Sequence, residues 1–301
     1  MKSYSSSPIG SYIYEYAKLN RLVITDIRII ATSDLSTVSL ISLDSGQKII
    51  LKVGKVSEVI MDEYFNHSNL YSHWQKHKDK FDFKIPRPLY FFQNHSSYLM
   101  EYVEGAKSLD EVFCASLMDS RSNLLPKLFA RVGVCLAQYH TVFTQMRPNT
   151  KSVLDHDSVD GLLSGSGKKE YLQIYRTFPK KCYRNILKDF KPQNILVAGE
   201  DIYFIDFQKI DYSAPLYYDL ARFIDTLHLF TFLEKPDQYF KNRKYLAKSA
   251  CSFLSGYGEV NMRLLSACRR LHQLEHVYIK RKKALNAFIL FLFYKLIIPK
   301  V

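Results

Sequence analysis

The chain has 301 residues, which is enough to bury a hydrophobic core in two lobes of unequal size. Its hydrophobic content of 47%, with only 11 glycines and 10 prolines, excludes a long disordered portion. The formal net charge of +13 favours acidic partners such as nucleotide phosphates, an anionic acceptor or a membrane surface. The five cysteines are widely spaced, without a Cys-x-x-Cys pair or a histidine cluster, which argues against a zinc site or a disulfide framework. We therefore expect a cytoplasmic protein, since the first residues also lack the apolar core of a signal peptide.

The N-terminal part of the chain predicts a small β-rich lobe. We expect a polar tail and a short helix over residues 1–22, followed by a lobe that covers residues 23–103. Its first strands are expected at residues 22–32, 37–44 and 47–53. The turn Asp44-Ser45-Gly46 is a hairpin signal, so the sheet should be antiparallel. The preceding turn, at residues 32–37, contains no glycine.

Two charged residues of this lobe are predicted to form a buried pair. Lys52 lies between Leu51 and Val53 in the third strand, so its side chain points to the opposite face of the sheet. The next helix has an apolar stripe, which consists of Val56, Ile60, His67, Leu70 and Trp74. Glu63 falls on this stripe, whereas Glu58 faces away from it. Because a buried lysine needs a partner, we predict a Lys52–Glu63 pair; the alternative is a lysine that reaches water beside a half-exposed glutamate.

The rest of the chain is predominantly helical in pattern. Residues 84–90 and 98–103 predict two more strands, and residues 104–301 predict a large helical lobe. Helices are expected at residues 109–118, 124–146, 223–233, 236–257 and 261–278. Residues 149–169 are polar and predict a surface loop, whose Gly-Ser-Gly-Lys fragment lacks the spacing of a Walker loop.

The C-terminal residues combine a basic cluster, residues 280–283, with an apolar run, residues 284–298. The run is shorter than the roughly 20 residues that a bilayer span needs. We expect a terminal helix that packs on the large lobe and leaves the basic cluster exposed for peripheral contact with an anionic membrane. The alternative is a helix that lies in the membrane interface.

The most informative stretch is Ile186–Arg222. A turn with Asp189, Lys191 and Asn194 leads into an apolar strand, and a second apolar strand ends at Asp206. Any one of these turn residues would be a weak signal by itself. Together they provide what phosphoryl transfer needs: a carboxylate that orients a hydroxyl, and an Asp–Asn oxygen pair that holds magnesium against phosphates.

The Asp-x-x-x-x-Asn spacing, followed by a strand and Asp206-Phe207, resembles the catalytic and metal-binding loops of the protein-kinase-like superfamily. The continuation Tyr218-Asp219-Leu220-Ala221 is more similar to its aminoglycoside phosphotransferase and choline kinase branch, with a lipopolysaccharide-kinase-like protein as one option. The resemblance implies a two-lobed α+β fold, with a β-rich N-terminal lobe and a helical C-terminal lobe. Two positions depart from the family: Leu187 stands where a loop-supporting histidine is usual, and Gln208 follows the Asp-Phe pair.

The resemblance also implies roles for the residues of these loops. Asp189 would orient the acceptor hydroxyl and accept its proton late, and Lys191 would stabilise charge on the transferring group. Asn194 and Asp206 would hold Mg²⁺. Asp219 would brace the catalytic loop.

A second group of roles concerns ATP. Lys52, kept in place by Glu63, would contact the α and β phosphates. At the hinge between the lobes, backbone groups of Glu101 and Val103 would bind the adenine edge.

The expected reaction is transfer of the γ-phosphoryl group of ATP to a hydroxyl of a sugar or another small molecule. The positive charge argues against a polycationic aminoglycoside and favours an anionic or membrane-bound sugar, such as a bacterial surface glycolipid. The alternatives are a non-catalytic pseudokinase that senses nucleotide or docks partners, and a protein kinase. No nucleic-acid-binding motif is present, and the sequence leaves the oligomeric state open.

Overall fold

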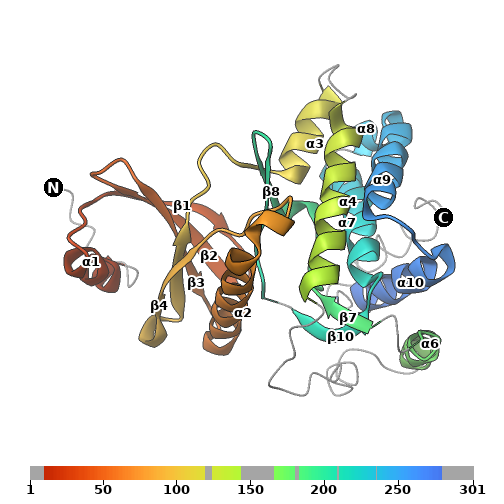
Figure 1. Cartoon of the computed structure of the whole chain (residues 1–301), viewed down its shortest axis with the longest axis horizontal. Helices are drawn as coiled ribbons and strands as arrows, with labels where there is room; N and C mark the ends of the chain where they lie inside the picture. The colour runs from red at the N-terminus through yellow and green to blue at the C-terminus, as the bar shows by residue number, and fades with distance from the viewer. Residues whose placement is uncertain are drawn as a thin grey trace. The chain divides into compact units, whose positions relative to one another are not determined.

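The computed structural model describes residues 10–118, 124–143, 166–179, 183–208, 210–234 and 236–279. The chain divides into two compact units. The first comprises Met1–Lys78, Lys84–Ala106 and Tyr203–Gln208, and the second Asp79–Phe83, Lys107–Ile202 and Lys209–Val301. Strands dominate the first unit and helices the second (Figure 1). This confirms the predicted α+β class with a β-rich N-terminal part and a helical C-terminal part.

The first unit is built on a five-stranded antiparallel sheet of order β1-β2-β3-β5-β4. Its helices are α1 (Gly10–Leu19) and α2 (Ser57–Lys76). Its strands are β1 (Ile24–Thr32), β2 (Ser36–Leu43), β3 (Lys48–Gly54), β4 (Pro88–Phe92) and β5 (Ser97–Glu101). Short 3-10 helices lie at Lys78–Lys80 and Gln93–His95.

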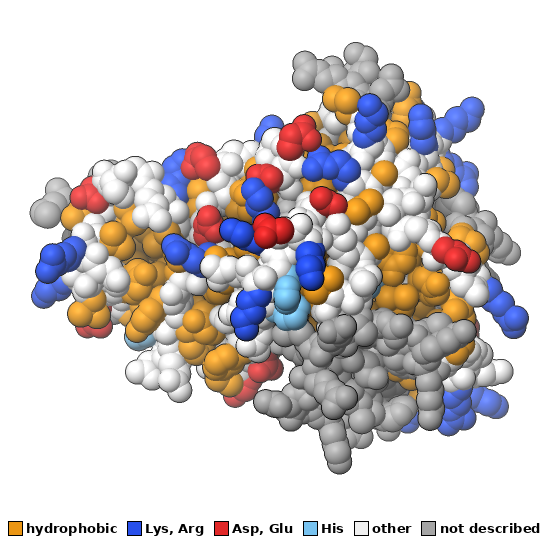
Figure 2. All heavy atoms as spheres, in the orientation of Figure 1, with side chains coloured by type: hydrophobic (Ala, Val, Ile, Leu, Met, Phe, Trp, Pro, Cys, Tyr) orange, Lys and Arg blue, Asp and Glu red, His pale blue; other side chains and the backbone are white. Residues whose placement is uncertain are grey.

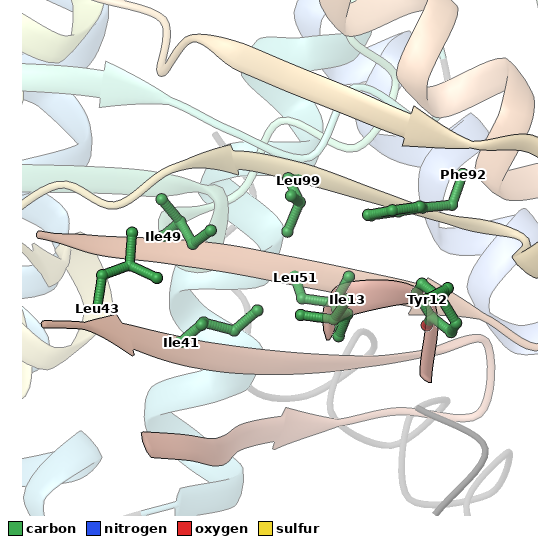
Figure 3. Packing of buried hydrophobic residues seen from close by; sticks show 8 residues of the cluster. All are labelled: Tyr12, Ile13, Ile41, Leu43, Ile49, Leu51, Phe92 and Leu99. Atoms are coloured by element: carbon green, nitrogen blue, oxygen red, sulfur yellow. The ribbon is translucent and has the colours of Figure 1, made fainter. Parts of the chain in front are cut away.

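The two faces of this sheet carry different side chains. On one face α1 places Tyr12 and Ile13 against an apolar layer from four strands, made of Ile41, Leu43, Ile49, Leu51, Phe92 and Leu99 (Figure 3). Because side chains alternate along a strand, Lys52 points away from Leu51 and from this layer. On its face the sheet meets α2, whose buried residues are Ile60, Glu63, His67 and Leu70. The alternation of side chains along the strands thus places the apolar layer on one face of the sheet and the Lys52–Glu63 pair on the other.

The second unit contains most of the helices. They are α3 (Leu109–Met118), α4 (Leu125–Val142), α6 (Ser166–Tyr175), α7 (Tyr218–Glu234), α8 (Pro236–Lys241), α9 (Arg243–Tyr257) and α10 (Met262–Ile279). One sheet joins β6 (Lys107–Ser108), β8 (Ile195–Ala198) and β9 (Asp201–Phe204), and another pairs β7 (Tyr183–Ile186) with β10 (Asp211–Pro215). A 3-10 turn, η6 (Pro192–Asn194), precedes β8. Strand β9 begins in the second unit and ends in the first.

Helices α4 and α9 pack side by side at two glycines (Figure 1). A Cβ atom at Gly133 would lie 2.1 Å from the carbonyl oxygen of Phe253, and one at Gly256 would lie 1.9 Å from the carbonyl oxygen of Ala130. The helix backbones therefore approach each other as closely as glycine allows. The contact fixes the helix that carries His140 against the helix that carries Tyr257.

Three expectations need correction. The prediction of a loop over residues 149–169 is wrong at its C-terminal end, because α6 begins at Ser166. Burial of Tyr171 stabilises this helix and outweighs the cost of the glycine in its first turn. The helix predicted over residues 236–257 is two helices that meet at Asn242. Strands β7 and β10 were not expected, since each is only four or five residues long.

The basic cluster and apolar run of residues 280–298 lie outside the described residues.

The charge of the chain is not confined to one region. On the face that Figure 2 shows, Lys and Arg side chains are spread over both units, with Asp and Glu side chains among them. Among the described helices, none has both the length and the hydropathy of a membrane span.

Candidate active site

The first unit contains the predicted pair of charged residues. Lys52 Nζ donates hydrogen bonds to Glu63 Oε1 at 2.6 Å and to Asp206 Oδ1 at 3.0 Å. Tyr98 lies opposite Lys52 in the β3–β5 register and donates its hydroxyl to the same Glu63 oxygen at 2.7 Å. Lys52 is 8% exposed and Glu63 1%. Burial would lower the pKa of Lys52, but the Asp206 and Glu63 carboxylates raise it above its ordinary value, so the ammonium group stays charged.

The segment that follows β9 is fixed to α2 within the same unit. Asn66 Nδ2 donates to the Phe207 carbonyl oxygen at 3.1 Å, and the ring of His67 packs on the buried Phe207 ring at 5.1 Å between centroids. Asp206 itself has a φ of 65°, a left-handed conformation that costs a non-glycine residue roughly 1–2 kcal/mol. The contacts of Phe207 with α2 hold the Asp206 carboxylate at Lys52 despite this cost.

The hinge segment has a simple hydrogen-bonding pattern. The Glu101 N–H donates to the Arg87 carbonyl oxygen at 2.8 Å, and the Ala106 N–H donates to the Val103 carbonyl oxygen at 3.3 Å. Glu101 uses its N–H in these bonds and Val103 uses its carbonyl. The groups that are predicted to bind adenine are the other two, the Glu101 carbonyl and the Val103 N–H. An acceptor and a donor two residues apart suit the amino group and ring nitrogen of an adenine edge. The contact with adenine stays a prediction.

The second unit contains the predicted catalytic loop, which joins β7 to η6. Lys191 Nζ donates to Asp189 Oδ2 at 2.7 Å, and Arg222 donates to Asp189 Oδ1 at 2.6 Å. Burial alone would raise the pKa of Asp189, but the Arg222 and Lys191 charges hold it well below its usual range. The carboxylate is therefore ionised at neutral pH and both of its oxygens are fixed in direction.

Asn194 is oriented by the same loop. Its Nδ2 donates to the Asp189 backbone carbonyl at 2.9 Å, which leaves the amide oxygen as the group available to a cation. Asn194 is 8% exposed, so this orientation is enforced by packing as well as by the hydrogen bond. Within the described residues no group of three or more His, Cys, Asp or Glu side chains could hold a metal ion.

Asp219 at the start of α7 has the bracing contacts that the sequence implied. Its Oδ2 accepts the Leu187 N–H at 2.8 Å and lies 3.0 Å from His140 Nε2. His140 Nδ1 in turn lies 3.0 Å from the hydroxyl of Tyr257. Asp219 is fully buried, and the loop therefore begins from an anchored backbone amide.

Four site residues escaped the sequence analysis. Arg222 contacts Asp189 and also donates to His272 Nε2 at 2.6 Å. His272 Nδ1 lies 3.2 Å from Asp225 Oδ2, and Arg269 Nε donates to Asp225 Oδ1 at 2.8 Å. The available signal was the presence of charged residues on apolar helices: Arg222 and Asp225 follow Asp219 at intervals of three, so all three fall near one side of α7.

The fold is similar to those of several solved kinases. No family model matches the chain, and a search of curated proteins found no match. Among solved structures, the amicoumacin kinase hAmiN in complex with AMP-PNP, Ca²⁺ and Ami superposes with a TM-score of 0.66 at 13% identity, over 94% of this chain and 92% of that one. The chain has a kinase-like fold.

Two further solved structures have a similar fold. The choline kinase LicA from Streptococcus pneumoniae matches with a TM-score of 0.60 at 14% identity, covering 95% of this chain and 96% of that one. A macrolide 2'-phosphotransferase type I matches with a TM-score of 0.58 at 12% identity, covering 93% and 94%. The fold predicted from the sequence is thereby confirmed.

Proposed function

We propose that the protein is an ATP-dependent phosphotransferase that moves the γ-phosphoryl group to a hydroxyl of a small molecule. The observation that carries this proposal is the environment of Asp189. A partly buried carboxylate that is kept ionised by Lys191 and Arg222, next to an oriented Asn194, is suited to align a hydroxyl for attack. The similarity to an amicoumacin kinase, a choline kinase and a macrolide phosphotransferase supports the same class of reaction.

The first unit supplies the groups that would bind the nucleotide. Lys52, charged and held by Glu63, would contact the α and β phosphates, and the hinge backbone at Glu101 and Val103 would bind the adenine. Glu63 is almost completely buried, so its role is to fix Lys52 rather than to touch the ligand. Tyr98 assists by holding the same carboxylate oxygen.

A divalent cation would be held by Asn194 and Asp206. Oxygen ligands from an amide and a carboxylate suit Mg²⁺, which completes its coordination shell with water and phosphate oxygens. Bound there, the ion would neutralise the charge that the phosphates carry during transfer. Lys191 lies 2.7 Å from Asp189 and would stabilise charge on the transferring group.

We further propose an anionic or membrane-bound sugar as the acceptor. The net charge of +13 supports this class over a polycationic aminoglycoside, because a basic protein attracts anionic ligands and repels cationic ones. Peripheral contact of the basic residues 280–283 with an anionic membrane stays a prediction, since these residues lie outside the described part of the chain.

A screen with γ-labelled ATP over sugars, glycolipids and peptides tests the reaction class. We expect label in a small molecule or glycolipid, and Asp189→Asn should reduce transfer by about two to four orders of magnitude while ATP affinity stays nearly unchanged. Label in peptides would identify a protein kinase instead. Binding of Mg-ATP without transfer to any acceptor or to water would favour the pseudokinase, and near-normal turnover in Asp189→Asn would refute the catalytic assignment.

A further inference from the structure

Helix α7 contacts the catalytic loop at two points that are one helical turn apart. Asp219 accepts the Leu187 N–H at 2.8 Å, and Arg222 donates to the Asp189 carboxylate at 2.6 Å. Residues three apart on a helix lie on the same side, and Leu187 and Asp189 are two apart in the loop. One face of α7 therefore holds the loop by its backbone at one position and by its functional carboxylate at another.

The arginine of this pair is itself held from behind. Arg222 has only donors, so His272 Nε2 must accept from it, and the proton of the neutral ring is then on Nδ1. That N–H points at Asp225 Oδ2, which lies 3.2 Å away. Burial and the Arg222 charge lower the pKa of His272 well below its ordinary value, which agrees with a neutral ring. His272, which belongs to α10, thus helps to fix the orientation of the Arg222 guanidinium group.

The last contact in this series is an ion pair between α7 and α10. Arg269 of α10 donates to Asp225 of α7 at 2.8 Å, and their side chains are 6% and 0% exposed. Charges buried this deeply are costly unless their partners are fixed. Each residue in the series of contacts Asp189–Arg222–His272–Asp225–Arg269 is therefore constrained by its neighbours. Arg222 is therefore held between His272 and Asp189 and is not free to move as an arginine on the surface would be.

We propose that Arg222, backed by His272, Asp225 and Arg269, is a positioning residue that sets the direction of the Asp189 carboxylate. It holds from α7 the carboxylate of a loop whose backbone Asp219 holds at Leu187. This inference rests on the proposed phosphotransferase function. The proposed effect of Arg222 on turnover passes through Asp189, and this distinguishes it from a residue that merely stabilises the fold.

A double-mutant cycle tests the claim with transfer from Mg-ATP to water, which requires no identified acceptor. Arg222→Met removes the donors and keeps the length of the side chain. We expect kcat to fall by at least about ten-fold with the KM for ATP within about two-fold. In an Asp189→Asn background the same substitution should change kcat by less than about two-fold, because the group that it positions is already lost.

Chemical rescue gives a second readout, since methylguanidine should restore part of the turnover of Arg222→Ala if a missing guanidinium is the cause. Arg131→Met is the matched control, because Arg131 forms an exposed ion pair with Glu200 in the same unit, and it should leave kcat unchanged. If Arg222→Met does not fold, His272→Leu takes its place in the cycle. His272→Gln, which keeps an acceptor and a donor, should retain more activity than His272→Leu.

The outcomes separate the two proposals. Equal factors for Arg222→Met in both backgrounds, or no methylguanidine rescue, would overturn the positioning role while Asp189→Asn still shows its full loss. Equal turnover of the wild type and Asp189→Asn would overturn the proposed function, and the positioning role with it.

Discussion

The bracing of the catalytic loop by Asp219 makes a quantitative prediction. Both contacts use the same oxygen, Oδ2, which accepts from the Leu187 amide and from His140 Nε2. Asp219→Ala leaves both buried donors without an acceptor. At roughly 1–3 kcal/mol for each unsatisfied group, the free energy of unfolding should fall by about 2–6 kcal/mol. That is a large part of the roughly 5–15 kcal/mol that holds a typical domain folded.

The conservative substitution should behave differently. In Asp219→Asn the amide oxygen can take the position of Oδ2 and accept both hydrogen bonds, while its nitrogen takes the place of Oδ1, which has no partner among the described atoms. That leaves one buried group unsatisfied by the substitution, against two in Asp219→Ala. The loss should therefore be smaller than in Asp219→Ala, since charged acceptors bind only about 1–1.5 kcal/mol more strongly than neutral ones.

Urea unfolding of both variants measures the difference, and hydrogen exchange at the Leu187 amide locates it. Glu200→Ala is the control, because its 95% exposed carboxylate should contribute less than about 1 kcal/mol. The reasoning is refuted if Asp219→Ala unfolds like the wild type, or if Asp219→Asn is the less stable of the two variants.

Three further outcomes follow from the structure. Asp206→Ala should weaken binding of Mg-ATP far more than binding of ATP measured in chelator, and equal losses in calorimetry would show that Asp206 is not a metal ligand. Gly133→Ala places a Cβ 2.1 Å from the Phe253 carbonyl oxygen, so the melting temperature should fall by an amount that corresponds to about 1–3 kcal/mol or more; an unchanged value would contradict the close packing of α4 and α9. Burial lowers the pKa of His67 to about 4 from 6.5, so the unfolded chain binds more protons between these values. Stability should therefore fall as the pH drops from 6.5 to 4, by up to about 3 kcal/mol from this residue, and a His67→Gln variant with an unchanged pH slope would refute the assignment.

The sequence was informative where local patterns decide the outcome. Alternation in β3 and the apolar stripe of α2 were enough to predict the Lys52–Glu63 contact, because each pattern fixes the face on which a side chain lies. The loop at Asp189 was recognisable for a different reason, because its Asp-x-x-x-x-Asn spacing resembles the catalytic loop of a known superfamily. The roles of these residues toward ATP and metal remain predictions, since the geometry concerns the protein alone.

Contacts that depend on pairing distant segments could not be predicted. Tyr98 reaches Glu63 only because the β3–β5 register places it opposite Lys52, and no single-sequence pattern sets that register. Arg222 reaches Asp189 across 33 positions, and His272 is a further 50 positions away. Charged residues on the helices α7 and α10 were an available signal, but helix periodicity does not identify their partners.

The two departures from the family pattern fall where side chains are not needed to hold the site. Leu187 is 6% exposed and packs in the core, while the loop is held through its backbone N–H by Asp219. Gln208 follows a segment that is already fixed, because Phe207 is anchored to α2 and Asp206 is paired with Lys52. The Asp189 carboxylate is nevertheless held in place, because its two oxygens are paired with Lys191 and Arg222. This argues for an active phosphotransferase over a pseudokinase, and turnover with water or an acceptor is the measurement that decides between them.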